Sequence, residues 1–475
     1  MSEKLYKRWA VPSVGEALSI WRSVFIAGVR QCGKTTLAHQ ALPGGEFRTL
    51  DDSALLDVAT DDPAGFVKRR DGSIMVIDEI QKAPKLLPEI KRILDADNAK
   101  GQYLLTGSAD IKTLPAVTES LAGRMGTIRL RPLACGEITG AEPDFLDRAF
   151  AADFHASVKG FDKDAILEIA FRGGYPEPLY MKGPAKRQWF KSYLDALLLH
   201  DIRKLMDVRA YAILRKMMEV LLARSAKFFS ENEIMSALGI GHETFTRFLA
   251  ILKTLYLVDE IPPWTSSDYA ATGKRSKFVA ADTGMMAAIL NWKLPDVALD
   301  SDRSGKVVES WVYNQIAPLA DLAPGRMMTQ FRDSRKREID FMVESDEGRT
   351  LGIEVKAGSL TSGFGYRIHP VTGGITFHFG TDFAAEKGSP VSCAADGTVL
   401  AVGDSTTYGI YVIVDHGSGV KTLYAHLDAT SLTDGQSVTK GGAIGAAGET
   451  GNATSPCVHF EITYNGVFIN PEYYI

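Results

Sequence analysis

A glycine-rich loop lies between an apolar segment and a helical segment near the N-terminus and limits the folds open to this part of the chain. Residues 24–27 have the composition of a short buried strand, the loop GVRQCGKT runs from Gly28 to Thr35, and TLAHQAL follows with a helical composition. In such a loop, glycines allow backbone N–H groups to turn toward phosphate oxygens beside the positive end of a helix. The order of strand, loop and helix therefore predicts a phosphate-binding α/β domain.

The side chains of this loop predict a site for ATP with Mg²⁺. Lys34 can reach the β- and γ-phosphates, and Thr35 can ligate the metal ion through its hydroxyl. The residues expected to bind the nucleotide in this segment are Gly28, Gly33, Lys34, Thr35 and Thr36.

Two further apolar segments end in polar residues that suit nucleotide hydrolysis. The segment SIMVIDE predicts a buried strand that ends in two carboxylates, with Asp78 on the metal ion and Glu79 as the base that polarises the attacking water. A core strand that ends in solvated acids is the alternative, and the nearby glycine-rich loop makes it the weaker one. The segment QYLLTGS predicts a third strand between the other two, with Thr106 or Ser108 near the γ-phosphate.

Residues 1–358 resemble the AAA-type ATPases of bacteria and archaea that carry a C-terminal domain of unknown function. The resemblance rests on the motifs GVRQCGKTTL, IMVIDEIQKAP, YLLTGSAD and ESLAGRMGTIRLRPL. It implies an AAA-type P-loop ATPase core over residues 1–140, with ATP hydrolysis as its activity. In that family the SLAGR segment supplies a basic residue near the nucleotide, which corresponds to Arg124 here. An exposed arginine that begins a strand is an alternative of similar weight.

The middle of the chain is predicted to be helical, with a lid or linker over residues 141–225 and a winged-helix-like segment over 226–265. In the second segment, an expected capping box at Ser230 and Glu233 precedes two amphipathic helices that a glycine-containing turn separates. A helix that reads DNA needs basic and amide side chains on its exposed face, but the segment HETFTR offers one arginine and one glutamate. Packing or protein contact is therefore favoured over nucleic-acid binding.

Residues 266–358 place acidic residues in a nuclease-like order. Glu309 is expected on a helix, Asp340 on a strand, and Glu354 and Lys356 on one face of the next strand. Such a set can hold one metal ion and activate water against a phosphodiester, and it resembles the restriction-endonuclease-like α/β fold of the family's C-terminal part. A β-hairpin with alternating polar faces is the alternative, and we favour it.

The character of the sequence changes at residue 358. Family members continue past the EVK strand to complete their domain, so the nuclease-like segment is expected to be truncated here. Glycine-rich strands follow, and five of the nine histidines lie after this point, which predicts an all-β domain over residues 361–475. Imidazole and carboxylate groups in the segments HFGTD, YAHL and CVHFE could meet at one tetrahedral zinc ion.

This C-terminal domain closely resembles the lysostaphin- and LytM-type zinc metallopeptidases. The resemblance rests on SGFGYRIHPVTGG, FHFGTDFAAEKGSPV, AADGTV, VIVDHGSGVKTLYAHL, VTKGGAIGAAGETGNATSP and VHFEI. It implies that His378, Asp382 and His459 bind Zn²⁺, that His426 orients water or stabilises the oxyanion, and that peptidoglycan peptides are the substrate. Cys457 stands where that family has the first histidine of a His-x-His motif. Peptide hydrolysis and a catalytically dead wall-binding module therefore both remain open.

Composition predicts a soluble multidomain protein and names no partner. The chain has 475 residues, a net charge of −5 and 45% hydrophobic residues, unlike a disordered or strongly basic protein. The four cysteines are scattered, which favours reduced thiols over a disulfide framework. The start lacks the apolar region of a signal peptide, and no run of about 18 apolar residues occurs. We therefore expect a cytoplasmic protein without a membrane span.

The two resemblances imply different compartments, because peptidoglycan lies outside the cytoplasm whereas ATP is found within it. A gene fusion or an assembly artefact accounts for this conflict better than a two-headed enzyme. In the competing hypothesis, the metallopeptidase is the working part and the ATPase region is a passenger.

Overall fold

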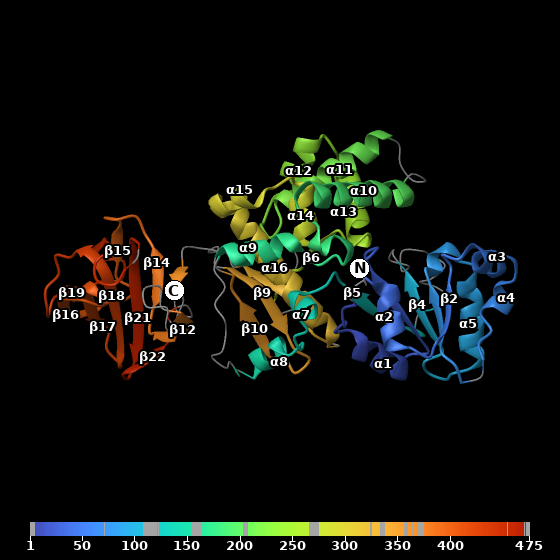
Figure 1. The fold of residues 1–475 in the computed structure, drawn as a ribbon, viewed down its shortest axis with the longest axis horizontal. Helices are drawn as coiled ribbons and strands as arrows, with labels where there is room; N and C mark the ends of the chain where they lie inside the picture. Colours follow the sequence, from blue (N-terminus) through green and yellow to red (C-terminus); the bar gives the residue numbers. More distant parts are fainter. Residues whose placement is uncertain are drawn as a thin grey trace. The chain divides into compact units, whose positions relative to one another are not determined.

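The computed structural model describes most of the chain and divides it into two compact units. The first unit comprises residues 1–153 and 163–357, and the second comprises 154–162 and 358–475 (Figure 1). The described residues are 5–70, 72–107, 121, 123–151, 153, 163–202, 208–265, 275–323, 325–332, 338–355, 360–362, 365–368, 375–453, 455–469 and 471. None of the helices among these residues is both long and apolar enough to cross a membrane.

A five-stranded parallel sheet forms the N-terminal part of the first unit. Its strands lie in the order β2-β3-β4-β1-β5, and every neighbouring pair is parallel. The strands are β1 (Ser23–Gly28), β2 (Glu46–Thr49), β3 (Met75–Asp78), β4 (Tyr103–Gly107) and β5 (Met125–Leu130). The QYLLTGS strand thus lies between the other two, as predicted. Because the strands are parallel, the carboxyl ends of β1, β3 and β4 meet at one edge.

Helices cover both faces of this sheet, so alternate side chains of a strand enter different cores. Val24 and Ile26 of β1 belong to the core that includes α1 and α2, whereas Phe25 and Ala27 belong to the core that includes α3, α4 and α5. These helices are α1 (Val11–Ile20), α2 (Lys34–Ala41), α3 (Ser53–Asp61), α4 (Pro63–Phe66) and α5 (Leu86–Ala96). Burial on both faces explains why the strands are continuously apolar.

A helical region follows the sheet and extends the core that contains α1 and α2. Its first elements are α7 (Cys135–Thr139), α8 (Phe145–Phe150), α9 (Lys163–Arg172), the 3₁₀ helix η3 (Glu177–Tyr180), α10 (Gly183–Ile202) and α11 (Val208–Ala223). Two helices and a hairpin come next: α12 (Glu231–Leu238), α13 (His242–Thr254), and the antiparallel strands β6 (Val258–Ile261) and β7 (Lys277–Ala280). The predicted capping box is wrong, because Ser230 makes no side-chain cap bond and Glu233 pairs with Arg224 instead.

The rest of the first unit packs one long helix against a small antiparallel sheet of order β10-β9-β8. Its elements are α14 (Thr283–Ile289), α15 (Leu294–Leu299), α16 (Ser301–Leu322), β8 (Met327–Arg332), β9 (Glu338–Glu344) and β10 (Thr350–Ile353). Glu309 lies on a helix and Asp340 on a strand, as predicted. Because β10 ends at Ile353, Glu354 lies beyond it and is exposed, and Lys356 is outside the described residues.

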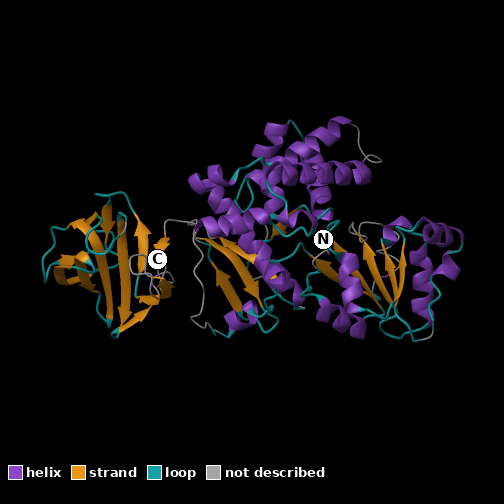
Figure 2. Ribbon diagram, viewed as in Figure 1, coloured by secondary structure: helices purple, strands orange, loops and turns teal. Residues whose placement is uncertain are grey.

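The second unit is built of strands, in contrast to the mixed first unit (Figure 2). Its main sheet follows the order β11-β14-β21-β18-β17-β16-β19, with the bounds β11 (Leu360–Ser362), β14 (Thr381–Ala384), β16 (Gly397–Ser405), β17 (Gly409–Asp415), β18 (Val420–Ala429), β19 (Ser437–Val438) and β21 (Cys457–Tyr464). The remaining strands are β12 (Gly365–Ile368), β13 (Ile375–His378), β15 (Pro390–Ser392), β20 (Ala443–Ala447) and β22 (Val467–Ile469). The predicted all-β character is confirmed for the described residues of this unit.

Candidate nucleotide and metal sites

The glycine-rich loop connects the buried end of β1 to the start of α2. A Cβ atom at Gly28 would lie 2.2 Å from the carbonyl oxygen of Leu130 on β5, so no larger residue fits there. Gly33, directly before α2, has a φ of 99°, in the region that glycine adopts without strain. The two glycines expected from the sequence thus have separate structural reasons, namely a close strand contact and a left-handed turn.

Three hydroxyl groups converge on Asp78 at the edge of the sheet where the loop begins. The Thr35 hydroxyl lies 3.0 Å from both carboxylate oxygens of Asp78, and the Thr49 hydroxyl donates to the same carboxylate over 3.3 Å. The Thr106 hydroxyl on the central strand β4 also donates to it. The strand order therefore brings together Thr35, Asp78 and Thr106, which were predicted from separate segments. Thr49 was not predicted, and Ser108 is outside the described residues.

Lys34 points its ammonium group back into the loop. Its side chain is only 4% exposed, and Nζ donates hydrogen bonds to the carbonyl oxygens of Gly28 at 3.1 Å and Val29 at 2.9 Å. The neighbouring Thr36 is partly buried on α2. The two carbonyl oxygens hold the ammonium group inside the loop, where the sequence predicts the phosphates.

Glu79 follows Asp78 in a strained backbone conformation. Its φ is 57°, which costs free energy for a residue with a side chain. Its backbone N–H donates to the Thr106 hydroxyl over 3.3 Å, and its carboxylate accepts from Gln81. The contacts thus connect the predicted base to the same hydroxyl that holds Asp78.

Two residues that the sequence did not identify hold the loop from outside. The buried Arg8 donates to the carbonyl oxygen of Cys32 at 2.6 Å and forms an ion pair with Glu137 at 2.9 Å. Tyr193 on α10 donates to the carbonyl oxygen of Arg30 over 3.0 Å. No local pattern marks either residue, because their role depends on contacts with distant segments.

The structure does not bring Arg124 to the glycine-rich loop. The Ser23 N–H donates to its carbonyl oxygen over 3.1 Å, so Arg124 lies beside the start of β1 while the loop follows the end of that strand. The two ends of β1 are five residues apart, which corresponds to about 16 Å along the strand. The Arg124 side chain forms an ion pair with Asp95. The alternative that it merely begins a strand fits these contacts better.

A buried lysine occupies the space between the acids of the nuclease-like segment. Lys277 Nζ lies 2.6 Å from Glu309 and 3.0 Å from Asp340. The second oxygen of Glu309 accepts from Lys227 at 3.1 Å, and that of Asp340 accepts from the N–H of Val355 at 2.9 Å. All four carboxylate oxygens therefore have partners. An internal ammonium group thus holds the two carboxylates, and Glu354 is exposed. Together with the antiparallel pairing of β9 and β10, these contacts fit the favoured hairpin alternative better than a metal-binding set.

Burial and charge set the protonation of this cluster. Burial, followed by the effect of Asp340, raises the pKa of Glu309 to about 7, against the opposing effect of Lys277. Burial opposes the ionisation of Lys277, but Glu309 and Asp340 outweigh it and raise the pKa of the ammonium group. The lysine therefore remains charged and stabilises the two acids.

Replacing Lys277 with methionine is expected to lower the free energy of unfolding by about 3–5 kcal/mol. The change removes the ammonium group that two buried carboxylates share and leaves Glu309 paired with the half-exposed Lys227. Without Lys277 the pKa values of the two carboxylates should lie above those of the unfolded chain, so the deficit should grow as pH rises. Denaturation followed by tryptophan fluorescence measures the first unit alone, since all six tryptophans precede residue 358.

The matched control is Lys253→Met, which removes a half-exposed lysine paired with Glu260 on β6. This change is expected to cost less than about 1 kcal/mol. Equal effects of the two substitutions would contradict a stabilising role for the buried cluster.

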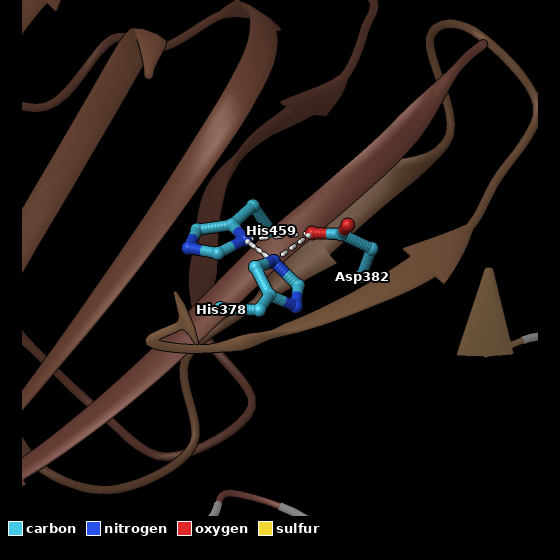
Figure 3. A group of neighbouring side chains, drawn as sticks. All are labelled: His378, Asp382 and His459. Carbon is cyan, nitrogen blue, oxygen red and sulfur yellow. Dashed lines mark hydrogen bonds and ion pairs between the residues drawn. The ribbon is translucent and has the colours of Figure 1, made fainter. Parts of the chain in front are cut away.

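In the second unit, two histidines and an aspartate meet at one point (Figure 3). His459 Nδ1 lies 2.6 Å from Asp382 Oδ1 and 3.0 Å from His378 Nε2, and His378 Nε2 lies 3.2 Å from the same Asp382 oxygen. All three residues are at most 9% exposed. The donors predicted from separate segments are therefore brought together.

The backbone explains this convergence. His378 ends β13, Asp382 lies on β14, and Asp382 pairs with His459 across the β14–β21 ladder. A Cβ atom at Gly380 would lie 2.5 Å from the carbonyl oxygen of Phe460 and 2.8 Å from the His459 ring. The glycine therefore lets the turn between the two donors approach β21 closely.

A carboxylate that the sequence analysis did not assign orients His459. Glu461 Oε1 lies 3.1 Å from His459 Nε2 and accepts from the Tyr408 hydroxyl at 2.9 Å. Burial lowers the pKa of His459, but hydrogen bonds to Asp382 and Glu461 outweigh it, and the net shift is upward. Since alternate residues of a strand share a face, the spacing of positions 459 and 461 was the signal that could have revealed this contact.

The donor set fits a zinc ion. Two imidazoles and one carboxylate are the ligand types of catalytic zinc sites, and a tetrahedron with bonds of about 2.0–2.1 Å has edges of about 3.3 Å, close to the observed separations. Burial opposes the ionisation of Asp382, but hydrogen bonds from His378 and His459 outweigh it and lower its pKa. The aspartate is therefore ionised, as a metal ligand must be.

His426 lies beside this cluster on β18, with its ring centre 5.7 Å from that of His459. Its Nδ1 lies 2.8 Å from the carbonyl oxygen of Thr450. Because a carbonyl only accepts hydrogen bonds, Nδ1 carries the proton and Nε2 of the neutral ring is unprotonated. Burial lowers the pKa of His426, so the neutral form is favoured. Its φ of 60° is also strained.

Cys457 begins β21 and is buried. It is two residues from His459, so its side chain lies on the same face of the strand. The described donors that lie within 4.8 Å of one another are those of His378, Asp382 and His459, and the cysteine sulfur is not among them. Cys457 thus shares the face of the metal cluster without belonging to it.

Comparison with known proteins identifies the two ends of the chain. Residues 21–139 match the profile of a family described as an AAA domain, and residues 376–471 match Peptidase family M23. Residues 163–296 and 304–364 match two families that are each described as a domain of unknown function.

Relatives of the C-terminal part are bacterial peptidases. The DD-carboxypeptidase/endopeptidase Mpg of Neisseria meningitidis serogroup B is 44% identical over 112 residues, which cover 24% of this chain and 26% of Mpg. The peptidoglycan DD-endopeptidase ShyB of Vibrio cholerae is 45% identical over 104 residues, 22% of this chain and 24% of ShyB. The chain thus spans about a quarter of the length of these relatives.

A further relative matches a much longer stretch. An uncharacterized protein of Mycobacterium tuberculosis is 26% identical over 362 residues, which cover 75% of this chain and 75% of that protein. Together with the geometry of the two sites, the matches establish that this chain carries an AAA-type P-loop domain at its N-terminus and a domain of the M23 peptidase family, of the lysostaphin and LytM type, at its C-terminus.

Proposed function

We propose that the N-terminal domain binds ATP with Mg²⁺ and hydrolyses it. The contact between Thr35 and Asp78 carries the proposal, because a hydroxyl and a carboxylate lie 3.0 Å apart where the glycine-rich loop begins. Oxygen ligands of this kind suit Mg²⁺. The buried ammonium group of Lys34 lies in the same loop, which supports binding of the phosphates beside the metal ion.

Each residue of this site has a distinct role in the proposed reaction. Loop N–H groups and Lys34 bind phosphate oxygens, while Thr35 and Asp78 hold Mg²⁺, which offsets negative charge on the phosphates when bound. Glu79 accepts a proton from the attacking water. Thr106 orients the Asp78 carboxylate through its hydrogen bond.

Replacing Glu79 with glutamine is expected to lower ATP turnover by about 10²–10⁴-fold, the usual contribution of a positioned base, while ATP binding is retained. Phosphate release measures turnover, and calorimetric titration measures binding. Glu89→Gln is the matched control, because Glu89 lies on α5 and pairs with Arg92. Loss of binding in Glu79→Gln, or unchanged turnover, would contradict the assigned role.

A second function is proposed for the C-terminal domain, which binds Zn²⁺ and cleaves peptide bonds of peptidoglycan. The convergence of His378, Asp382 and His459 supports zinc binding, and the names of Mpg and ShyB support the substrate class. Zn²⁺ supplies Lewis-acid polarisation of the carbonyl and activation of water when bound. His426 Nε2 is the unprotonated nitrogen that accepts a proton from the attacking water. Glu461 keeps the His459 ring oriented through its contact with Nε2.

Cys457 determines how active this domain is. A histidine at this position would supply a second imidazole base in addition to His426. A thiol replaces such a base poorly. Cys457→His is therefore expected to raise the rate of peptidoglycan-peptide cleavage by about 10²-fold or more, measured by chromatography of digested peptides. Cys457→Ala separates the gain of a base from the removal of the thiol. An equal rise in both variants would show that the thiol inhibits the site and that histidine adds no base.

A further inference from the structure

A cationic cavity lies in the first unit and includes no residue of the glycine-rich loop. Its volume is about 580 Å³, and it lies among the end of α9, the start of α10, α14 and the loop that follows α14. Cavities of about 300–1,000 Å³ are typical of small-molecule sites. Nothing in the proposed ATPase or peptidase chemistry uses this cavity.

The charge of the lining is strongly unbalanced. Five lining side chains are cationic and one, Glu168, is a carboxylate; the cations are Arg172, Lys182, Lys186, Arg187 and Lys293. Lys182 and Lys293 are exposed, and Arg187 is partly buried. The cavity therefore concentrates positive charge where an anion can enter.

One buried donor strengthens this preference, and one buried lysine adds little to it. The Nε atom of Arg172 is buried and has no hydrogen-bond partner among the described residues, although buried donors usually have one. Lys186 is 8% exposed, and its ammonium group donates to the carbonyl oxygens of Phe171 and Arg172. Burial lowers the pKa of Lys186, and its ammonium group is already held by carbonyl oxygens, so the more exposed cations of the lining are the ones available to an anion.

The first turn of α10 adds further positive potential. This 20-residue helix begins at Gly183, which lines the cavity, and its first turn contains no acidic residue. Unpaired backbone N–H groups and the helix dipole make such an end attractive to phosphate. The helix end, the cavity and the cations thus favour the same kind of ligand.

The remaining lining is apolar and aromatic, so an inorganic ion alone would leave most of it unused. Leu179, Ala287 and Leu294 contribute apolar surface, together with Tyr180 and Trp292. Tyr180 is 63% exposed, and its hydroxyl lies 2.8 Å from that of Tyr6. An exposed aromatic ring held in place suits stacking against a flat base.

We propose that this cavity binds a nucleoside monophosphate, either free or as the 5′-phosphorylated end of a nucleic-acid strand. The phosphate lies at the start of α10 between Lys182 and Arg187, and the base lies on the apolar lining near Tyr180. This site is separate from the ATP site, because none of its lining residues belongs to the glycine-rich loop.

The test is calorimetric titration of the full chain carrying Lys34→Ala, with AMP as the probe. Saturable binding is expected, and it should weaken at least tenfold when Lys182→Ala and Arg187→Ala are added. Lys191→Ala is the matched control, because Lys191 is exposed on the same helix but does not line the cavity; it should leave AMP affinity unchanged.

Further probes distinguish the ligand. Adenosine should bind at least tenfold more weakly than AMP, and so should inorganic phosphate. A 5′-phosphorylated oligonucleotide that binds more tightly than AMP would identify a strand end as the ligand, whereas equal binding would identify the free nucleotide. No AMP binding, or binding that is insensitive to Lys182→Ala and Arg187→Ala, would overturn the proposal without affecting the ATPase assignment.

Discussion

Replacing Lys34 with alanine is expected to lower ATP hydrolysis by at least about 10²–10³-fold, the usual cost of removing one preorganised group that stabilises transition-state charge. The reason is geometric, because the Lys34 ammonium group is buried inside the loop and held by the carbonyl oxygens of Gly28 and Val29. It is therefore in place for phosphate oxygens, and alanine supplies no charge there. Release of inorganic phosphate from ATP with Mg²⁺ measures the effect.

Two variants give this experiment its controls. Lys100→Ala removes an exposed lysine before β4 and should leave turnover unchanged. Lys34→Arg keeps the charge but replaces a compact ammonium group with a planar fork, so it should restore little activity. Wild-type turnover in Lys34→Ala would show that hydrolysis does not occur at this loop, and the N-terminal assignment would then fail.

Replacing His378 with alanine is expected to reduce bound zinc from one ion per chain to almost none. The variant loses one of three converging donors, and the loss of a direct ligand should exceed the 10–100-fold effect typical of outer contacts. The remaining pair, Asp382 and His459, lies 2.6 Å apart and would hold the ion with two donors. Metal analysis of protein purified with zinc, followed by competition with a chelator, measures the change.

His416→Ala is the matched control for this change. His416 lies in the same domain and contacts the carbonyl oxygen of Asp396 and the Thr422 hydroxyl, outside the metal cluster. Its replacement should leave zinc content unchanged. Full zinc occupancy in His378→Ala would mean that the three side chains form a hydrogen-bonded cluster instead of a metal site.

The sequence determined the features that depend on short spacings. The glycine-rich loop, the acids that end β3 and the hydroxyl on β4 could be located because each motif lies within one strand or its adjoining turn, where period and composition carry the information. The same holds for His378 and Asp382, four positions apart around one turn. The change at residue 358 was also visible, since composition differs on its two sides.

Which distant groups meet depends on how the elements pack in three dimensions. The sequence placed Glu309 and Asp340 in a nuclease-like order, but Lys277 on β7 lies between them. Arg124 was expected near the nucleotide, yet the parallel register with β1 places it at the opposite end of the sheet. Arg8, Tyr193, Glu461 and the cationic cavity likewise follow from strand order and helix packing. A local sequence pattern indicates whether a segment forms a helix or a strand. These contacts depend instead on the register of paired strands and on the packing of helices that lie far apart in the chain.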